Sequence, residues 1–350
     1  MSDSFEADVI FSCGEDKYLP VVDVWIVIDV LRATTVMTRW FELGGTELYP
    51  VRTPDEAKHL VLELKARGSS PLLMGEVNGI PPEGFDFGNS PLELNYELIQ
   101  AHYCGVMSTT NGTVALLEAA SSGSPVLAAS MRNASSVLDY ALTIGNRIGL
   151  LCSGRKRRPS WEDTLCAGAI IEELLSHGDT LMTDSAKIAL SLWQNRIENL
   201  HEYVRKSEHA LYLEHIGYAE DIAFCCEYNA SSVVPMLASD TKEHTILRSV
   251  SGSARPYPRA LNASVKTENK IEPSEPPKKA DPFEELLSYT RNPRSIFSSE
   301  RRIVNENSIS RLLCRYSRRY VYRCAVKSRT VSCSINRRNQ KDKGIKPGRI

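Results

Sequence analysis

The stretch VVDVWIVIDVLRATT, residues 21–35, constrains the fold more than any other part of the chain. It begins as an apolar run dominated by Val, Ile and Trp, and it ends in Asp29, Arg32, Thr34 and Thr35. A continuous apolar run rich in β-branched residues is typical of a strand buried on both faces of a parallel sheet. Because open α/β sheets bind ligands at the carboxyl ends of their strands, we expect these polar residues to lie at a ligand site.

Strand and helix patterns alternate along the rest of the first 230 residues. Further strands are predicted at 46–51, 70–76, 105–110, 125–130, 148–154 and 221–229, and helices at 34–44, 53–68, 90–103, 112–123, 133–145, 160–175 and 183–217. Two of these helices begin with a capping box that has Pro in the first turn, at Thr53 and at Ser90. The alternation predicts a three-layer α/β/α domain with a mostly parallel sheet, and leaves antiparallel pairing of some strands open.

The charge distribution divides the chain into two predicted parts. Residues 1–240 carry 17 Lys and Arg against 33 Asp and Glu, a net charge of −16, whereas residues 241–350 carry 25 against 10, a net charge of +15. The second part contains seven prolines between residues 256 and 293, a composition typical of disorder. We therefore predict an α/β domain at 1–240 and a disordered basic extension at 241–350. The extension, with its interleaved tyrosines, could bind nucleic acid or an anionic membrane, but charge runs are weak evidence for a partner and an unstructured extension is favoured.

The cysteines and the N-terminal residues indicate the compartment. The nine cysteines have spacings that match no zinc site or disulfide framework. The segment MSDSFEADVIF lacks the basic and apolar regions of a signal peptide, and no apolar window is long enough for a membrane helix. We expect a reduced, cytoplasmic protein with no membrane partner, and a homo-oligomer stays open.

Polar clusters follow four predicted strands, and together they contain acids, hydroxyls and amides at helix starts. Besides the residues of the first strand, they are Glu76 at the end of 70–76 with Asp86, Asn89 and Ser90 after it, Thr109, Thr110, Asn111, Gly112 and Thr113 around the end of 105–110, and Ser153, Gly154, Glu162 and Asp163 around and after the end of 148–154. Parallel strands would bring these clusters to one crevice.

Such a crevice suits a phosphorylated ligand. The N-termini of helices have unpaired N–H groups that bind phosphate. The guanidinium of Arg32 can donate two hydrogen bonds to one phosphate. Carboxylates beside an anion require a cation between them, and Mg²⁺ is the ion that prefers oxygen ligands and phosphate. The candidate Mg²⁺ ligands are Asp29, Glu76, Asp86 and Asp163.

Structural roles are the alternative for most of these residues. Asp163 can complete the cap of its own helix, Asp86 can be a turn residue, and the threonine hydroxyls can bond backbone groups at a strand-to-helix turn. Arg32 can be the ion-pair partner of Asp29. Glu76 follows SPLLMG at the end of a predicted strand, so it is the acid that we most expect to lie in the crevice. The seven histidines show no metal-ligand spacing and are interpreted as surface or core residues.

The segments IDVLRATT, GFDFGNSP, TTNGT and CSG followed by SWED stand in an order that resembles the 2-phosphosulfolactate phosphatases, the ComB family. The resemblance covers roughly residues 20–237, including GYAEDIAFC. It implies an α/β enzyme that uses Mg²⁺ to remove phosphate from 2-phospho-3-sulfolactate, a step towards coenzyme M. The substrate would be a small phosphorylated anion.

Three positions depart from the family pattern. Val77 and Val114 stand where the family usually has Arg, and Arg155 stands where it usually has Thr. Two missing arginines would weaken binding of a substrate that carries phosphate, sulfonate and carboxylate groups. The basic run 155–158 either compensates or indicates a phosphatase acting on another small phosphorylated acid.

Several mechanisms fit these residues. The leading hypothesis is a Mg²⁺-dependent phosphomonoesterase in which Asp29 is either a metal ligand or the nucleophile, and Arg32 stabilises the developing charge. Cys152 and Arg158 have the C-x5-R spacing of cysteine-dependent phosphatases, although Pro159 replaces the usual hydroxyl residue. The remaining alternative is a non-catalytic relative that binds an anion or nucleic acid, and the grouped acids count against it.

Overall fold

The computed structural model describes residues 4–14, 19–196, 199–238 and 244–250, together with the backbone of 320–327 and 330–337. The chain forms two compact units, Met1–Leu261 and Asn262–Ile350. The strands of the first unit are β1 (Phe5–Ile10), β2 (Val24–Ile28), β3 (Glu47–Val51), β4 (Leu72–Gly75), β5 (Cys104–Ser108), β6 (Val126–Ala129), β7 (Arg147–Cys152), β8 (Thr180–Met182), β9 (Val234–Ala238) and β10 (Ile246–Val250). Its α-helices are α1 (Ala33–Glu42), α2 (Pro54–Ala66), α3 (Tyr96–Ala101), α4 (Gly112–Ala120), α5 (Ala134–Ala141), α6 (Trp161–Leu174), α7 (Asp184–Gln194), α8 (Leu200–Val204), α9 (Glu208–His215) and α10 (Ala219–Cys225).

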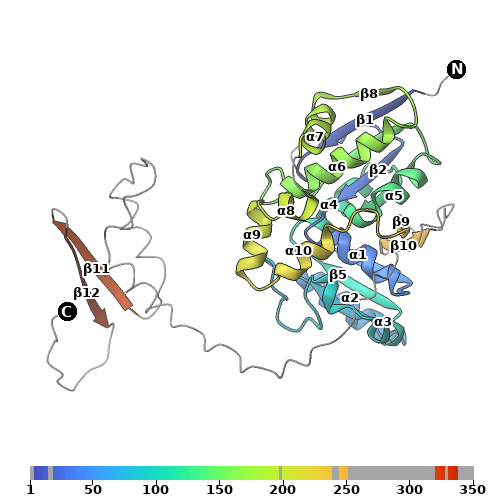
Figure 1. The fold of residues 1–350 in the computed structure, drawn as a ribbon. Coiled ribbons are helices and arrows are strands. Elements are labelled where there is room, and N and C mark those ends of the chain that lie inside the picture. The colour runs from blue at the N-terminus through green and yellow to red at the C-terminus, as the bar shows by residue number, and fades with distance from the viewer. Residues whose placement is uncertain are drawn as a thin grey trace, which may run out of the picture. The chain divides into compact units, whose positions relative to one another are not determined.

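The first unit is an α/β structure built on a mixed ten-stranded sheet, which confirms the predicted class (Figure 1). The strand order is β4-β5-β3-β10-β9-β6-β2-β7-β1-β8. Parallel pairs join β6, β2, β7, β1 and β8 into a first block, and β3, β5 and β4 into a second block. Between the blocks, β6 with β9, β9 with β10 and β10 with β3 are antiparallel. The sheet extends past residue 240, because β10 is part of it.

The second block folds across α1 and α4 instead of continuing a flat sheet. In a flat sheet, three successive antiparallel pairings would send the carboxyl ends of the two blocks to opposite edges. However, α4 contacts both β2 and β3. One apolar cluster also contains Trp25 of β2, Trp40 of α1 and Met107 of β5. This packing brings the ends of β4 and β5 towards the end of β2.

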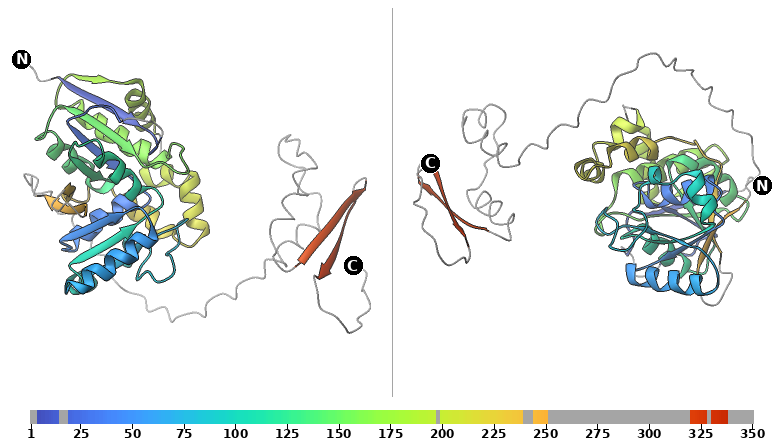
Figure 2. Two further views of the ribbon diagram at one scale, coloured as in Figure 1. Left: turned by 180° about the vertical axis from the view of Figure 1, so that it is seen from behind. Right: turned by 90° about the horizontal axis from the view of Figure 1, so that it is seen from below.

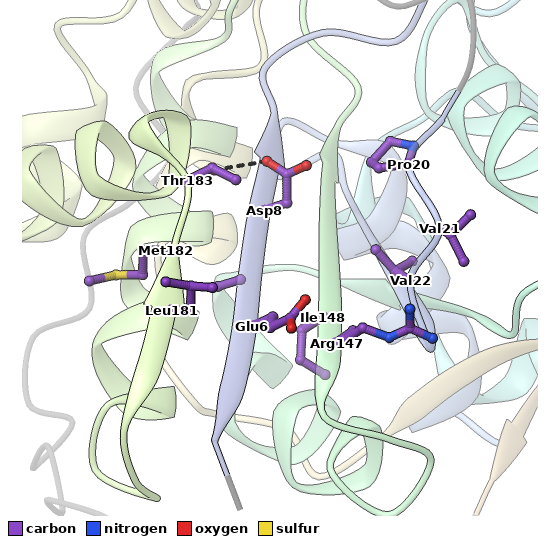
Figure 3. A pocket seen from close by; sticks show the side chains of 11 residues that line it. Glu6, Asp8, Pro20, Val21, Val22, Arg147, Ile148, Leu181, Met182 and Thr183 are labelled. Atoms are coloured by element: carbon purple, nitrogen blue, oxygen red, sulfur yellow. Dashed lines mark hydrogen bonds between the residues drawn. The ribbon is translucent and has the colours of Figure 1, made fainter.

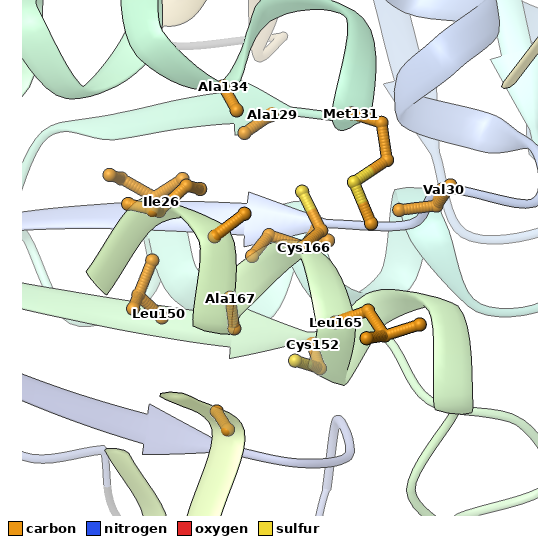
Figure 4. Close-up of a cluster of buried hydrophobic side chains, with 14 of the residues drawn as sticks. Ile26, Val30, Ala129, Met131, Ala134, Leu150, Cys152, Leu165, Cys166 and Ala167 are labelled. Atoms are coloured by element: carbon orange, nitrogen blue, oxygen red, sulfur yellow. The ribbon is translucent and has the colours of Figure 1, made fainter. Parts of the chain in front are cut away.

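Helices cover both faces of the first block, which gives the predicted three layers. On one face, α5, α6 and α7 pack over a cluster that includes Ile26, Leu150 and Cys166 (Figure 4). On the other face lie α1 and α4, and α2 covers the outer face of the second block (Figure 2). All five residues of β2 are buried, as its apolar sequence predicts.

Some element predictions were wrong. The predicted strand 221–229 is helix α10 and its continuation, because Asp221, Ile222 and Cys225 are buried at helical spacing and a short apolar run does not distinguish the two structures. The predicted helix 183–217 is three helices, since Asn199 and Ser207 accept N-cap hydrogen bonds inside it. The predicted helix 90–103 is a short 3₁₀ turn (Pro91–Glu93) followed by α3. The strands β1, β8, β9 and β10 were not predicted.

The second unit contains two strands in the part that the structure describes. These are β11 (Tyr320–Lys327) and β12 (Thr330–Arg337), which pair antiparallel. The predicted disorder of residues 251–319 and 338–350 lies outside the described residues. Among the described helices, none is long and apolar enough to span a membrane.

Candidate active site

Asp29 is the centre of the candidate site. It follows β2 directly, is buried, and accepts a hydrogen bond from the backbone N–H of Ala33 at 3.2 Å, in the first turn of α1. Burial raises the pKa of Asp29 to about 6. The positive charge of His209 and a hydrogen bond from Ser153 oppose this rise, and the negative charge of Glu76 adds to it. Asp29 therefore lies among charged side chains from several elements, as the strand-end argument predicts.

Asp163 ties the end of β7 to the end of β2. Its Oδ1 accepts from the N–H of Val30 at 2.8 Å, and its Oδ2 accepts from the Ser153 hydroxyl and the Gly154 N–H, both at 3.2 Å. Burial and the neighbouring charge of Asp29 raise the pKa of Asp163 well above its ordinary value. Both carboxylate oxygens of Asp163, a predicted metal ligand, thus already accept hydrogen bonds from the protein.

Glu76 connects the ends of β4 and β5. Its Oε1 accepts from the N–H of Thr110 at 2.7 Å, and its Oε2 accepts from the N–H of Gly79 at 2.6 Å and from the Thr110 hydroxyl at 3.2 Å. Nearby, Gly112 begins α4 so close to Asp29 that a Cβ at residue 112 would lie 2.6 Å from Asp29 Oδ2. Glycine at this position lets the N-terminus of α4 approach the Asp29 carboxylate.

Arg32 lies in a buried ion pair with Asp221 of α10. Arg32 Nη1 donates to Asp221 Oδ2 at 2.6 Å, and Arg32 Nη2 donates to the carbonyl of Gly79 at 3.0 Å. The guanidinium carbon lies 4.2 Å from the ring centre of Tyr218, and the Ser90 hydroxyl donates to Asp221 Oδ1 at 2.6 Å. The alternative in which Arg32 pairs with Asp29 is therefore wrong. Sequence reasoning missed Asp221 because it assigned this segment to a strand, although GYAEDIAFC was part of the family resemblance.

The predicted threonine hydroxyls bond mainly to nearby backbone. Thr34 and Thr35 donate to the carbonyls of Asp29 and Val30 at 2.7 and 2.8 Å. The hydroxyls of Thr109 and Thr113 each accept from the other residue's N–H at 3.0 Å, and this reciprocal pair closes the β5–α4 turn. These hydroxyls shape the turns whose N–H groups would face a ligand.

The other predicted residues differ in where they lie. Asn89 is buried beside Ser90, and its Oδ1 has no hydrogen-bond partner among the described residues. Asn111 is half-buried at the N-cap of α4 and makes no capping hydrogen bond with its side chain. Asp86 lies apart from the other acids, because it is exposed and its carboxylate accepts from the N–H of Leu73 on β4 at 2.9 Å.

The acids do not form a metal site built from protein ligands alone. Within the described ranges, no group of three or more His, Cys, Asp or Glu side chains is arranged to hold a metal ion. Mg²⁺ commonly binds through one or two carboxylates, several waters and the phosphate of a substrate. The buried carboxylate of Asp29 and the unpartnered amide oxygen of Asn89 are hard oxygen donors of this kind, so the chemistry of these residues fits such an ion.

The structure places Cys152 away from solvent. Cys152 ends β7 and is fully buried in the apolar cluster under α6 (Figure 4). Arg158 is exposed and closes a two-residue turn with Arg155, in which Lys156 and Arg157 both have positive φ. The C-x5-R segment thus does not form a loop around the thiol, and this arrangement does not support attack by Cys152.

Sequence reasoning placed Glu162 in the polar cluster after β7 but gave it no role, and it missed His209. Glu162 stands in the first turn of α6, and its Oε1 lies 3.0 Å from Nδ1 of His209 on α9. Burial opposes the charge of Glu162, but the hydrogen bond and the charge of His209 outweigh burial and lower the pKa of this carboxyl. A carboxylate that precedes Asp163 by one residue was the available sequence signal, whereas a lone helical histidine gives none.

A separate pocket of about 380 Å³ lies between β1, β7, β8 and residues 20–22 (Figure 3). Three charged side chains line it, Glu6, Asp8 and Arg147; Asp8 accepts from the Thr183 hydroxyl at 2.8 Å, and Arg147 pairs with Asp23 at 2.6 Å. None of the predicted site residues lines this pocket. The candidate chemistry therefore stays at the strand ends around Asp29.

Comparison with known proteins assigns the chain to a family. The family model for 2-phosphosulpholactate phosphatase matches residues 14–240. The chain belongs to the 2-phosphosulpholactate phosphatase family. A probable 2-phosphosulfolactate phosphatase of Pseudothermotoga lettingae is 36% identical over 218 residues, which are 62% of this chain and 90% of the relative. Those of Deinococcus radiodurans and Thermus thermophilus are 35% and 33% identical, over 63% and 66% of this chain and 90% and 95% of the relative. The family is one of phosphoric monoester hydrolases, and the match includes every residue of the candidate site.

Proposed function

We propose that the chain is a Mg²⁺-dependent phosphatase that hydrolyses 2-phospho-3-sulfolactate to sulfolactate and phosphate. Family membership supports the reaction and the substrate, since the relatives are named for both. The observation that carries the proposal to particular residues is the buried Asp29 carboxylate between the N-termini of α1 and α4. We also place the reaction on the route to coenzyme M, as the family resemblance implies.

The residues of the chain would act on the phosphate as follows. The N–H groups in the first turn of α4, which Gly112 brings beside Asp29, would hold phosphate oxygens and stabilise the charge that develops on them. Asp29 and Asn89 would hold Mg²⁺, which supplies positive charge to the phosphate when it is bound. Asp29 must be ionised for this role, or for the alternative role of nucleophile. The Arg32–Asp221 pair would fix the turns around the site.

Phosphate release by the full chain tests this proposal, measured on 2-phosphosulfolactate with Mg²⁺ and after treatment with EDTA. We expect turnover that requires Mg²⁺, disappears in Asp29→Asn and persists in Cys152→Ala. Turnover that ignores EDTA but requires Cys152 would favour the thiol mechanism despite its burial. If neither 2-phosphosulfolactate nor a panel of small phosphomonoesters is hydrolysed, the phosphatase proposal is wrong and a non-catalytic anion-binding role takes its place.

A phosphatase for another small phosphorylated acid is the second candidate. The observation that favours it is the absence of arginine at Val77 and Val114. Val77 is 45% exposed in the turn after β4, and Val114 is half-buried in the first turn of α4. Both positions are therefore close to residues of the site, and neither supplies a charge for a sulfonate. Comparing kcat/KM for 2-phosphosulfolactate with that for 2-phosphoglycerate and 2-phospholactate would decide between the two substrate classes.

A further inference from the structure

Glu162 and His209 form a partly buried carboxylate–imidazole pair beside the acids of the site. The Glu162 side chain is 1% exposed and that of His209 is 19% exposed, so the imidazole reaches solvent while the carboxylate does not. Glu162 Oε1 contacts His209 Nδ1 at 3.0 Å, and Glu162 Oε2 is buried with no hydrogen-bond partner among the described residues. The carboxylate of the next residue, Asp163, binds the N–H of Val30, adjacent to Asp29. Glu162 is therefore the sequence neighbour of a residue that is hydrogen-bonded to the backbone next to Asp29.

Helix α9 holds His209 over the ends of two strands. The Tyr212 hydroxyl donates to the carbonyl of Asn78 at 2.8 Å, in the turn after β4, and the Arg155 guanidinium lies 4.8 Å from the Tyr212 ring centre, in the turn after β7. Residues 209 and 212 are three apart, so they share one face of the helix. This face is directed at the two turns that carry Glu76 and Ser153.

The second ring nitrogen of His209 is available for a substrate. Nδ1 is directed at Glu162, and within the described part of the chain Nε2 makes no hydrogen bond. A carboxylate on one nitrogen fixes the orientation of the ring and stabilises the imidazolium, which then carries a proton on the other nitrogen. The charge of His209 also lowers the pKa of Asp29, so the ring is within electrostatic range of that carboxylate.

We propose that His209 is the general acid that protonates the leaving-group oxygen of the phosphomonoester, and that Glu162 is its positioning residue. This inference rests on the proposed phosphatase function. As the bond between phosphorus and the ester oxygen breaks, the imidazolium transfers its Nε2 proton to that oxygen, so the product leaves as a neutral alcohol. The phosphorus accepts oxygen from water, directly or after transfer to a protein group. The proton that this water releases restores the imidazolium.

The chemistry of the leaving group explains why such an acid is needed. The alcohol of an alkyl phosphate such as 2-phosphosulfolactate is a very weak acid, so its alkoxide is a poor leaving group. A positioned general acid contributes about 10²- to 10⁴-fold to such a step. An aryl ester such as p-nitrophenyl phosphate leaves as a stable phenolate and gains little from protonation. The two kinds of ester therefore separate a proton donor from a structural residue.

The experiment compares His209→Asn with wild type on 2-phosphosulfolactate and on p-nitrophenyl phosphate, with Mg²⁺ and the full chain. The Asn amide can still reach Glu162 from the position of Nδ1, but it has no group at Nε2. We expect kcat on the alkyl ester to fall about 10²- to 10⁴-fold and kcat on the aryl ester less than tenfold. His215→Asn, on the exposed side of the same helix, is the matched control and should change neither value.

Each outcome bears on one proposal. A loss below tenfold on the alkyl ester, or equal losses on both esters in a folded variant, would overturn the role of His209 but not the phosphatase function. If wild type releases phosphate from neither ester, the proposed function itself has failed. Glu162→Gln gives a second readout, with a smaller loss that again falls mainly on the alkyl ester, because the ring loses the carboxylate that orients it. A wild-type urea midpoint for His209→Asn excludes unfolding as the cause.

Discussion

Replacement of Asp221 by Ala should destabilise the first unit severely, because it removes one half of a buried ion pair. The Arg32 and Asp221 side chains are 2% and 3% exposed, and their charged atoms lie 2.6 Å apart. The carboxylate also accepts the Ser90 hydroxyl, so Ala leaves a buried guanidinium without its counter-charge and a buried hydroxyl without an acceptor. The contacts of Arg32 with Gly79 and Tyr218 remain, but neither supplies a negative charge.

The size of the effect follows from this burial. Breaking a buried ion pair by removing one partner costs about 3–5 kcal/mol. Solvent does not screen the loss, since both groups are nearly inaccessible. A change of about 1 kcal/mol shifts the melting temperature of a domain of this size by roughly 2–4 °C, so we expect a decrease of about 6–20 °C. This is a large part of the roughly 5–15 kcal/mol that stabilises a typical native protein.

Urea unfolding of the full chain measures the change, with an unchanged m-value indicating that stability alone has altered. Asp184→Ala is the matched control, because Asp184 pairs with Lys187 on the surface and its side chain is 95% exposed; its midpoint should not move. In Arg32→Met with Asp221→Ala, the two losses should sum to more than the loss in the double variant, because the pair is broken only once. A loss below about 1 kcal/mol for Asp221→Ala, the range of an exposed pair, would refute the reasoning.

Three further predictions concern the site. Burial raises the pKa of Asp29 from 3.8 to about 6, so the protonated carboxyl stabilises the fold at low pH and this stabilisation is lost as the pH rises through 6. Asp29→Asn is neutral at every pH. In EDTA it should therefore have a higher urea midpoint than wild type above pH 6, and the difference should vanish towards pH 4. Equal midpoints at neutral pH would contradict this. Gly112→Ala should reduce kcat strongly and lower the free energy of unfolding by about 1–3 kcal/mol, because the new Cβ would displace the Asp29 carboxylate. The control is Gly123→Ala, where a Cβ meets no atom within 4 Å and kcat should stay unchanged. The double variant Val77→Arg with Val114→Arg should lower KM for 2-phosphosulfolactate about tenfold or more, if each arginine adds a charge-assisted hydrogen bond of about 1.5–3 kcal/mol. An unchanged KM would show that these positions do not face the sulfonate.

The ends of the strands could be predicted from the sequence because they depend on local patterns. The apolar run before Asp29 is rich in β-branched residues, which favours a buried strand over a helix, and Ser160 is the N-cap that sets the start of α6. The residues that complete the site could not be found in this way. His209 and Asp221 lie on helices far along the chain, and only the packing of α9 and α10 brings them to Arg32 and Glu162.

Asp86 shows the opposite error. Its segment GFDFGNSP follows β4 and contains residues of the site, so the sequence suggested that its acid would join Asp29. In the structure the segment turns back along β4, where Asp86 binds the N–H of Leu73. The backbone of an outer strand needs partners for its N–H groups, and a nearby carboxylate satisfies one of them. Motif membership thus placed the loop correctly but not the direction of each side chain.

The balance of charge in the site leads to a final test of the metal hypothesis. The acids gathered there are Asp29, Glu76, Glu162, Asp163 and Asp221. Arg32 offsets the charge of Asp221, and His209 offsets that of Glu162 when the imidazole is protonated, so a phosphate dianion would still meet a net negative site. Two routes remove this repulsion: a bound cation, or protonation of Asp29 and Asp163, whose pKa values are both raised.

The route through a bound cation predicts that EDTA abolishes turnover at every pH. The second predicts that turnover survives EDTA and increases as the pH falls below about 6, where Asp29 is protonated. Activity measured across this pH range, with and without EDTA, separates the two routes and shows which one allows the acids to bind an anion.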